Sequence, residues 1–243
     1  MYIVTLCILI ILCIVVIILM PEFKNSKITN LFFIIITYIC YISLALIIYL
    51  DVGFYDWNFQ NVLPTANVSP FMFFILPIYF ILPKTPKKYY LLLISLLSVG
   101  MFLSPFINCI YFHSISYTFH PHFLLDYIAH LSLFLWGIYI IKSQQVELNI
   151  KNTLISSSII ISVALTMMII NVIFDTAFFG LSLYGKHNIY NQVIVSNSYL
   201  SALIYFAGLI VVLLLGFSLQ LLVNRINKKS IPKDGNLISW ICA

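Results

Sequence analysis

The chain has 243 residues, of which 63% are hydrophobic and only 8% are charged. Soluble domains carry about 25% charged residues, so this composition excludes a soluble globular protein and indicates an integral membrane protein. The formal net charge of +5 does not indicate nucleic-acid binding. The positions of the basic residues along the chain account for it, because lysine and arginine collect on one side of a membrane protein.

Seven apolar segments are long enough to cross a bilayer, which takes about 20 residues in a helix. We therefore predict an all-α membrane protein with a seven-transmembrane-helix bundle over residues 1–224. The third segment is the shortest, and it contains Pro70 and Pro77. The segments are 2–20, 31–50, 66–83, 89–112, 122–141, 153–174 and 198–223.

The basic residues predict the orientation of the bundle, because lysine and arginine are enriched in cytoplasmic loops. Eleven of the twelve follow the first, third, fifth or seventh segment, whereas Lys186 lies on the opposite side. We therefore predict a cell-membrane protein with its N-terminus outside, and with residues 225–243 as a short basic cytoplasmic tail. The eleven residues are Lys24, Lys27, Lys84, Lys87, Lys88, Lys142, Lys151, Arg225, Lys228, Lys229 and Lys233.

Residues 113–130 hold four of the five histidines and lead from a predicted outer loop into the fifth apolar segment. Pro121 stands where a helix can begin, because a proline in the first turn loses no hydrogen bond and already has a helical φ. His122, Asp126 and His130 then recur every four residues, so they form one polar stripe about 12 Å long. Ionisable groups are costly in a membrane and should face the bundle interior. We expect a functional site here.

Other polar residues are predicted at a similar depth in the outer half of the bundle. Asn67 opens the third segment, and Asn108 lies near the outer end of the fourth. Asn171 and Asp175 are one turn apart at the outer end of the sixth. A polar pocket open to the outer leaflet would accommodate them all. We therefore predict Asn67, Asn108, His122, Asn171 and Asp175 as substrate-binding residues.

Three kinds of chemistry fit the stripe. His130 could act as a general base on a hydroxyl or on water, with Asp126 orienting its ring and with Thr65 or Ser69 as the hydroxyl. A metal could bind instead, but His122 and His130 are about 12 Å apart, too far to share one ion at bonds of about 2.1 Å. We expect neither a metal nor another cofactor. The stripe could also be a structural hydrogen-bond network between helices.

Residues 121–130, PHFLLDYIAH, resemble the histidine helix of the androgen-induced family of membrane hydrolases, which act on fatty-acid esters of hydroxy fatty acids. A wider pattern resembles the YwaF-like bacterial integral membrane family and its animal relatives, which include an ether-phospholipid acyltransferase. It comprises Leu63-Pro64, a glycine and a proline in the fourth segment, His130, and Asn171 before a polar aromatic loop. The resemblance covers residues 60–215.

The resemblance implies that His130 is the catalytic or polar-site histidine and that Thr65 lies near the position of the hydrolases' threonine nucleophile. The acyltransferase branch has a cysteine just after its Leu-Pro pair. This chain has none between Cys40 and Cys109, and this departure argues against cysteine-based acyl transfer.

We expect an enzyme of lipid acyl groups, a hydrolase or an acyltransferase, with a membrane lipid as substrate and with His130, Asp126 and Thr65 as catalytic residues. The alternative is a non-enzymatic membrane protein, either a small transporter or an assembly factor. A hydroxyl within ~3 Å of a His130 nitrogen would favour the enzyme. A continuous polar path to the cytoplasmic half would favour transport, but the inner halves of the segments hold almost no ionisable groups.

Overall fold

The structure, a computed structural model, is mostly helical over the residues it describes and has no strand among them. Five of its helices are long and apolar enough to cross a membrane, which agrees with the predicted all-α membrane protein, and the count of seven spanning helices stays a prediction. The structure describes Ile11, Val15, Ile17 and residues 26–50, 63–64, 68–111, 121–174 and 198–230. The five helices are α2 Ser26–Leu50, α5 Lys84–Tyr111, α6 Pro121–Lys142, α7 Ile150–Phe174 and α9 Ser198–Ser230.

The two ends of the chain are described only in part. In the first predicted segment, the described residues Ile11, Val15 and Ile17 are helical, and the rest of 2–20 lies outside the described residues. At the other end, α9 continues past residue 224 to Ser230. The predicted boundary between the bundle and the basic tail therefore falls within this helix.

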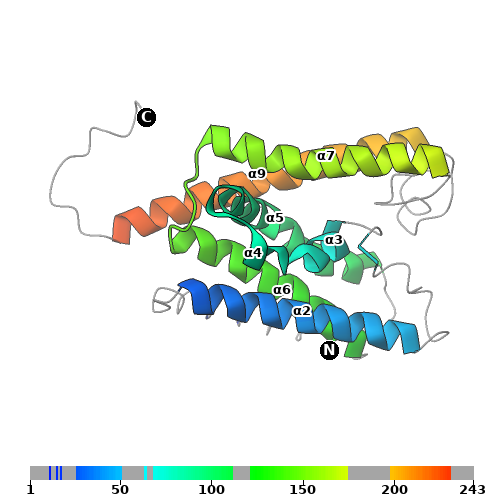
Figure 1. Ribbon diagram of the computed structural model, residues 1–243, viewed down its shortest axis with the longest axis horizontal. Coiled ribbons are helices and arrows are strands. Elements are labelled where there is room, and N and C mark those ends of the chain that lie inside the picture. Colours follow the sequence, from blue (N-terminus) through cyan, green and yellow to red (C-terminus); the bar gives the residue numbers. More distant parts are fainter. Residues whose placement is uncertain are drawn as a thin grey trace.

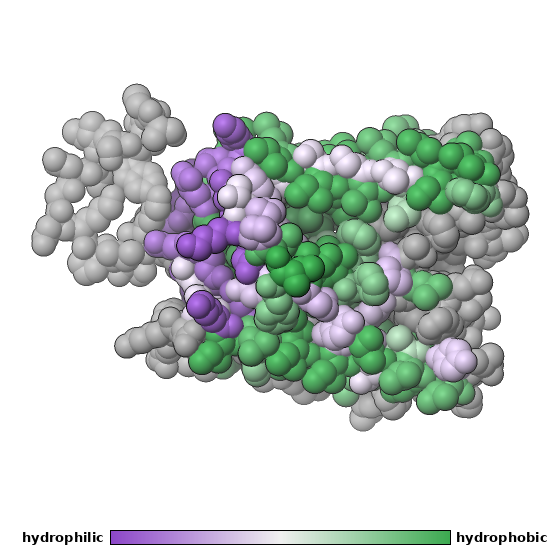
Figure 2. All heavy atoms as spheres, viewed as in Figure 1, coloured by the Kyte–Doolittle hydropathy of each residue, from purple (hydrophilic) through white to green (hydrophobic). Residues whose placement is uncertain are grey.

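The helices α5 and α6 form the centre of the bundle (Figure 1). Helix α6 packs between α2 and α5, and α5 also packs against α9 and α7. The apolar part of α6 is mostly buried, whereas α7 and α9 expose most of theirs. Much of the outer surface is accordingly apolar, as Figure 2 shows for one face, and lipid would cover it in a membrane. The polar residues of α6 thus lie in the most enclosed helix.

The third predicted segment, 66–83, is a broken helix. It consists of α3, Val68–Ile75, and the short α4, Ile78–Ile81, with a turn at Leu76 and Pro77. Proline has no N–H, and its ring collides with the carbonyl group four residues earlier in a continuous helix. A single spanning helix is therefore interrupted at Pro77.

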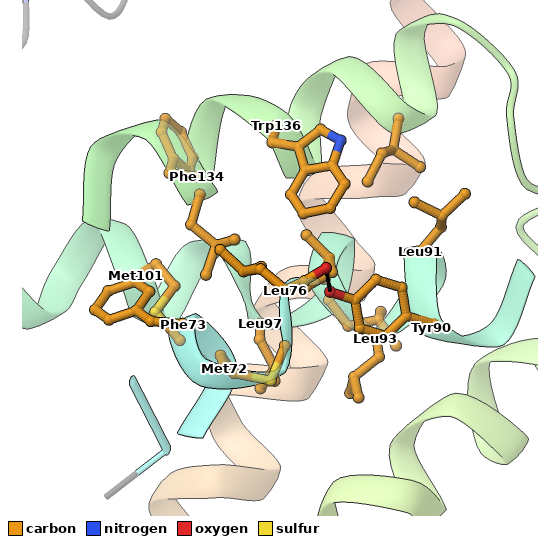
Figure 3. Close-up of a cluster of buried hydrophobic side chains, with 14 of the residues drawn as sticks. Met72, Phe73, Leu76, Tyr90, Leu91, Leu93, Leu97, Met101, Phe134 and Trp136 are labelled. Carbon is orange, nitrogen blue, oxygen red and sulfur yellow. Dashed lines mark hydrogen bonds between the residues drawn. The ribbon is translucent and has the colours of Figure 1, made fainter. Parts of the chain in front are cut away.

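A tyrosine of α5 lies beside the carbonyl groups at this break. The Tyr90 hydroxyl donates to the carbonyl oxygens of Ile75 and Leu76, each at 3.5 Å; Figure 3 shows Tyr90 beside Leu76. Broken helices persist at membrane depth where neighbouring helices satisfy the freed backbone groups. The break is enclosed by buried side chains of α3, α5 and α6, among them Met72, Phe73, Leu97, Met101, Phe134 and Trp136.

The basic residues gather at one end of the bundle. The N-terminal ends of α2, α5 and α7 and the C-terminal ends of α6 and α9 lie together at the left of Figure 1. The same end is the hydrophilic side in Figure 2. This is the clustering that the loops predicted, and the cytoplasmic location of this end stays a prediction. The described residues there include Lys27, Lys84, Lys87, Lys88, Lys142, Lys151 and Arg225.

A buried hydrogen-bond network lies next to this basic end and was not predicted. Trp136 Nε1 of α6 donates to Asn30 Oδ1 of α2 at 2.8 Å. Asn30 Nδ2 donates to the Tyr79 hydroxyl at 3.0 Å and to Gln145 Oε1 at 2.6 Å. Gln145 Nε2 returns a bond to Asn30 Oδ1 at 3.3 Å. One asparagine thus joins α2, α4, α6 and the connection that follows α6.

Replacing Asn30 by leucine should lower the free energy of unfolding by about 1–3 kcal/mol, because it leaves the buried Trp136 N–H without its acceptor. Thermal unfolding in detergent would measure the loss. Adding Trp136→Phe removes the orphaned donor, so the double variant should lose less than the sum of the two single variants. Strictly additive losses would contradict this coupling.

Candidate functional site

The core of the candidate site is a histidine–aspartate pair on α6. This helix begins at Pro121, as predicted, and carries Asp126 and His130 one turn apart. His130 Nδ1 lies 2.8 Å from the backbone oxygen of Asp126 and 3.2 Å from its Oδ1. Both residues are buried, with exposures of 5% for Asp126 and 3% for His130. The helical spacing therefore produces the pairing that the sequence predicted.

The two contacts of His130 Nδ1 define which ring nitrogen carries the proton. Both partners are oxygen acceptors, so Nδ1 must be the donor. In a neutral imidazole the other nitrogen, Nε2, then has a free lone pair and acts as an acceptor. Asp126 thus fixes both the tautomer and the orientation of the ring, and Nε2 is the nitrogen left for chemistry.

His130 Nε2 is buried and has no hydrogen-bond partner among the residues that the structure describes. A buried polar atom without a partner costs about 1–3 kcal/mol, and native structures leave few of them. An unpaired, oriented acceptor in an enclosed helix is therefore the strongest sign of a ligand site in the described part of the chain.

Helix α3 covers the histidine. The Phe73 ring meets the His130 ring edge to face, with 5.0 Å between centroids, and lies 5.6 Å from the ring of Tyr41 on α2. Ser69 precedes Phe73 by one helical turn and so lies on the same side of α3. The hydroxyl expected within hydrogen-bond reach of Nε2 is not present among the described residues, and Thr65 lies outside them.

The remaining predicted site residues are only partly visible. Asn171 is buried, at 1% exposure, on α7, a helix that packs mainly against α5. Asn108 and His122 belong to α5 and α6, but their side chains lie outside the described part of the structure. Asn67 and Asp175 lie outside it entirely. Of the eight predicted residues, the structure brings together Asp126 and His130.

Polar side chains also continue along the α2–α6 interface toward the basic end. Thr37 and Ser132 share a buried hydrogen bond of 2.5 Å, about two turns from the Asn30–Trp136 contact along α2. Sequence reasoning missed these residues because it searched for ionisable groups. The two hydroxyls bond to each other, Ser132 Oγ also lies 3.1 Å from the backbone oxygen of Ala129, and the indole of Trp136 is bonded to Asn30. These pairs therefore hold α2 against α6.

Comparisons with protein-family models, with curated proteins and with solved structures find no match to this chain. Within the described residues, no three histidine, cysteine, aspartate or glutamate side chains are grouped so that they could hold a metal ion. The chemistry of the Asp126–His130 pair therefore carries the functional proposal.

Proposed function

We propose that this chain is a membrane-embedded enzyme of lipid acyl groups, a hydrolase or an acyltransferase, with His130 as general base and Asp126 as the residue that orients it. The observation that carries the proposal is the unpaired, buried Nε2 of His130 behind an Asp126-bonded Nδ1. A general base placed in this way accelerates a reaction that needs proton transfer by about 10²–10⁴-fold.

In the proposed step, His130 Nε2 takes the proton of a hydroxyl group, and the hydroxyl oxygen attacks the carbonyl carbon of the acyl ester. The imidazolium formed is stabilised by the Asp126 carboxylate 3.2 Å from Nδ1. The C–O bond of the acyl ester then breaks, and His130 returns the proton to the departing alkoxide. The acyl group is then an ester of the attacking side chain. By the same proton transfers through His130, a lipid hydroxyl in an acyltransferase, or water in a hydrolase, attacks this ester and releases the side-chain hydroxyl.

We propose Thr65 as the attacking hydroxyl because it lies just before α3, the helix whose Phe73 contacts His130. We further propose that the acyl group binds in the outer half of the bundle. The side chains of Asn67, Asn108, His122, Asn171 and Asp175 would line this binding site.

We propose a cell-membrane location with the N-terminus outside, supported by the gathering of basic residues at the other end of the bundle (Figure 2). On this orientation the His130 end faces the outer leaflet. The apolar surface of the bundle would let a lipid substrate approach sideways from the bilayer. Kinship with the YwaF-like family is part of the same proposal, and it rests on the wider pattern of Leu63-Pro64, the glycine and proline of the fourth segment, His130 and Asn171.

The alternative, a small transporter or an assembly factor, would draw support from the polar pairs along α2 and α6. Within each pair the two side chains bond to each other. This favours a structural role for the pairs over a role in a polar transport path. The Asp126–His130 pair differs from them in leaving one polar atom unpaired. For this reason we favour the enzyme.

Comparative lipidomics tests the proposal. Cells that express the wild type, His130→Ala or the control Ser158→Ala, an exposed serine of α7, would be matched for protein level. We expect one lipid class to change its acyl composition with the wild type and the control but not with His130→Ala. Identical lipid compositions in all three, with the His130→Ala protein equally abundant and equally stable in detergent, would contradict the proposal that the protein is an enzyme.

A further inference from the structure

A cluster of lysines stands where the broken helix meets α5. We call residues 78–88 the α4–α5 corner; it contains α4, the Leu82-Pro83 connection and the first turns of α5. Lys84 and Lys88 are one turn apart and exposed, and Lys87 between them is half-buried. Three positive charges therefore occupy the start of a single helix at the basic end of the bundle.

The charge of this corner is not neutralised within the described residues. The carboxylates that the structure describes are Asp126, which pairs with His130, and Glu147 in the connection between α6 and α7. No described carboxylate forms a salt bridge with Lys84, Lys87 or Lys88. The ammonium groups of the corner thus have no carboxylate partner among the described residues and can bind an anion.

Lys87 is held in position by an aromatic ring. Its Nζ lies 4.5 Å from the centroid of the Tyr79 ring, a cation–π distance. The Tyr79 hydroxyl accepts from Asn30 Nδ2 at 3.0 Å, and its ring packs edge to face on Trp136 with 6.1 Å between centroids. Tyr79 is therefore a fixed platform, and less conformational entropy is lost when Lys87 meets a ligand.

Lys88 has a similar aromatic neighbour. Its Nζ lies 4.7 Å from the centroid of the Tyr89 ring. Tyrosines of this kind are enriched at the headgroup level of a bilayer. Tyr79 and Tyr89 therefore favour a position for this corner at the boundary between the hydrocarbon and the polar headgroups.

The surface next to these lysines is strongly apolar. Ile81 is 79% exposed and Phe80 is 53% exposed, and both precede Lys84 by three or four residues. Helix α4 ends at Ile81, and only two residues separate it from α5, so these exposed apolar residues and the lysines are neighbours in the chain. A soluble anion would use the ammonium groups alone, whereas a phospholipid would use the ammonium groups and the apolar rim together.

We propose that the α4–α5 corner binds an anionic phospholipid. Its phosphate lies between Lys84, Lys87 and Lys88, and its acyl chains lie along Phe80 and Ile81. The ammonium–phosphate contacts are charge-assisted hydrogen bonds, and each basic residue near an anionic membrane surface adds to the attraction. This site is separate from the proposed chemistry at His130, and it requires no catalytic activity.

The test compares lipids and variants of the full-length protein in mild detergent. Native mass spectrometry would count phosphatidylglycerol and phosphatidylcholine molecules retained by the wild type, by K84Q/K87Q/K88Q and by K27Q/K151Q/R225Q. The last variant removes the same number of charges from the same end of the bundle outside the corner. We expect the wild type and this control to retain phosphatidylglycerol preferentially, and the corner variant to bind it at least about tenfold more weakly.

Equal losses in the two charge variants would mean a diffuse electrostatic effect and would overturn a defined site. Absence of any preference for phosphatidylglycerol would do the same. Inorganic phosphate, added at millimolar concentration, should not displace the lipid. A second variant, F80A/I81A, should weaken phosphatidylglycerol binding while leaving all charges in place. Unchanged lipid binding in this variant would show that Phe80 and Ile81 do not contact the acyl chains, and displacement of the lipid by inorganic phosphate would show that the corner takes a soluble anion.

Discussion

Replacing Gly216 by alanine should destabilise the folded protein by about 3 kcal/mol or more, at the upper limit of what an overpacked core usually costs. A Cβ atom at this position of α9 would lie 1.9 Å from the carbonyl oxygen of Leu96 and 2.7 Å from its carbonyl carbon. These are backbone atoms of α5, so no side chain can turn away. Helices α5 and α9 would have to separate.

The separation would also break a polar contact. Gln220 lies one turn after Gly216 on α9, and its Nε2 donates to the backbone oxygen of Ser95 at 2.8 Å. Ser95 adjoins Leu96, the residue that Gly216 touches. Because Gly216 has no side chain, α9 can come close enough to α5 for Gln220 to reach Ser95. The alanine substitution would therefore remove both the close helix packing and this hydrogen bond.

Gly208→Ala is the matched control, because a Cβ there meets nothing within 4 Å. This variant should be as stable as the wild type or slightly more stable, since alanine is the better helix former by about 1 kcal/mol. Thermal unfolding of both variants in the same detergent would measure the difference. Equal melting temperatures would show that α5 and α9 are not packed as closely as the structure indicates.

The long helices could be predicted from sequence because the signal is local. An apolar run of about 20 residues is sufficient to indicate a spanning helix, and α2, α5, α6, α7 and α9 follow from such runs. The effect of the two prolines in the third segment could not be predicted in the same way, because it depends on where each one lies relative to the start of the helix. Pro70 lies in the first turn of α3, where no N–H bond is lost, and only Pro77 interrupts the helix.

The Asp126–His130 pair was predictable for the same reason, since four residues make one helical turn. The partners of α2 were not. Asn30 and Thr37 are seven residues apart and share a face of the helix, but Trp136 and Ser132 are 106 and 95 residues further along the chain. Which helix meets that face depends on side-chain packing across the bundle, and no spacing within α2 encodes it.

If His130 is the base, Asp126→Asn should lower turnover of the responsive lipid class by less than His130→Ala, which removes the base and should cost about 10²–10⁴. An asparagine can still accept a hydrogen bond from Nδ1, and the backbone oxygen at 2.8 Å remains to hold the ring. The tautomer therefore survives. What is lost is the negative charge that stabilises the imidazolium.

The measurement is turnover by the purified protein in vesicles, together with the melting temperature of each variant. We expect unchanged melting temperatures and turnover in the order wild type, Asp126→Asn, His130→Ala. Equal turnover of Asp126→Asn and the wild type would show that the carboxylate charge has no part in the reaction. Activity losses that followed losses of stability would assign the pair to packing. Replacing a histidine that is only structural would lower the melting temperature, and turnover would fall only because less protein is folded.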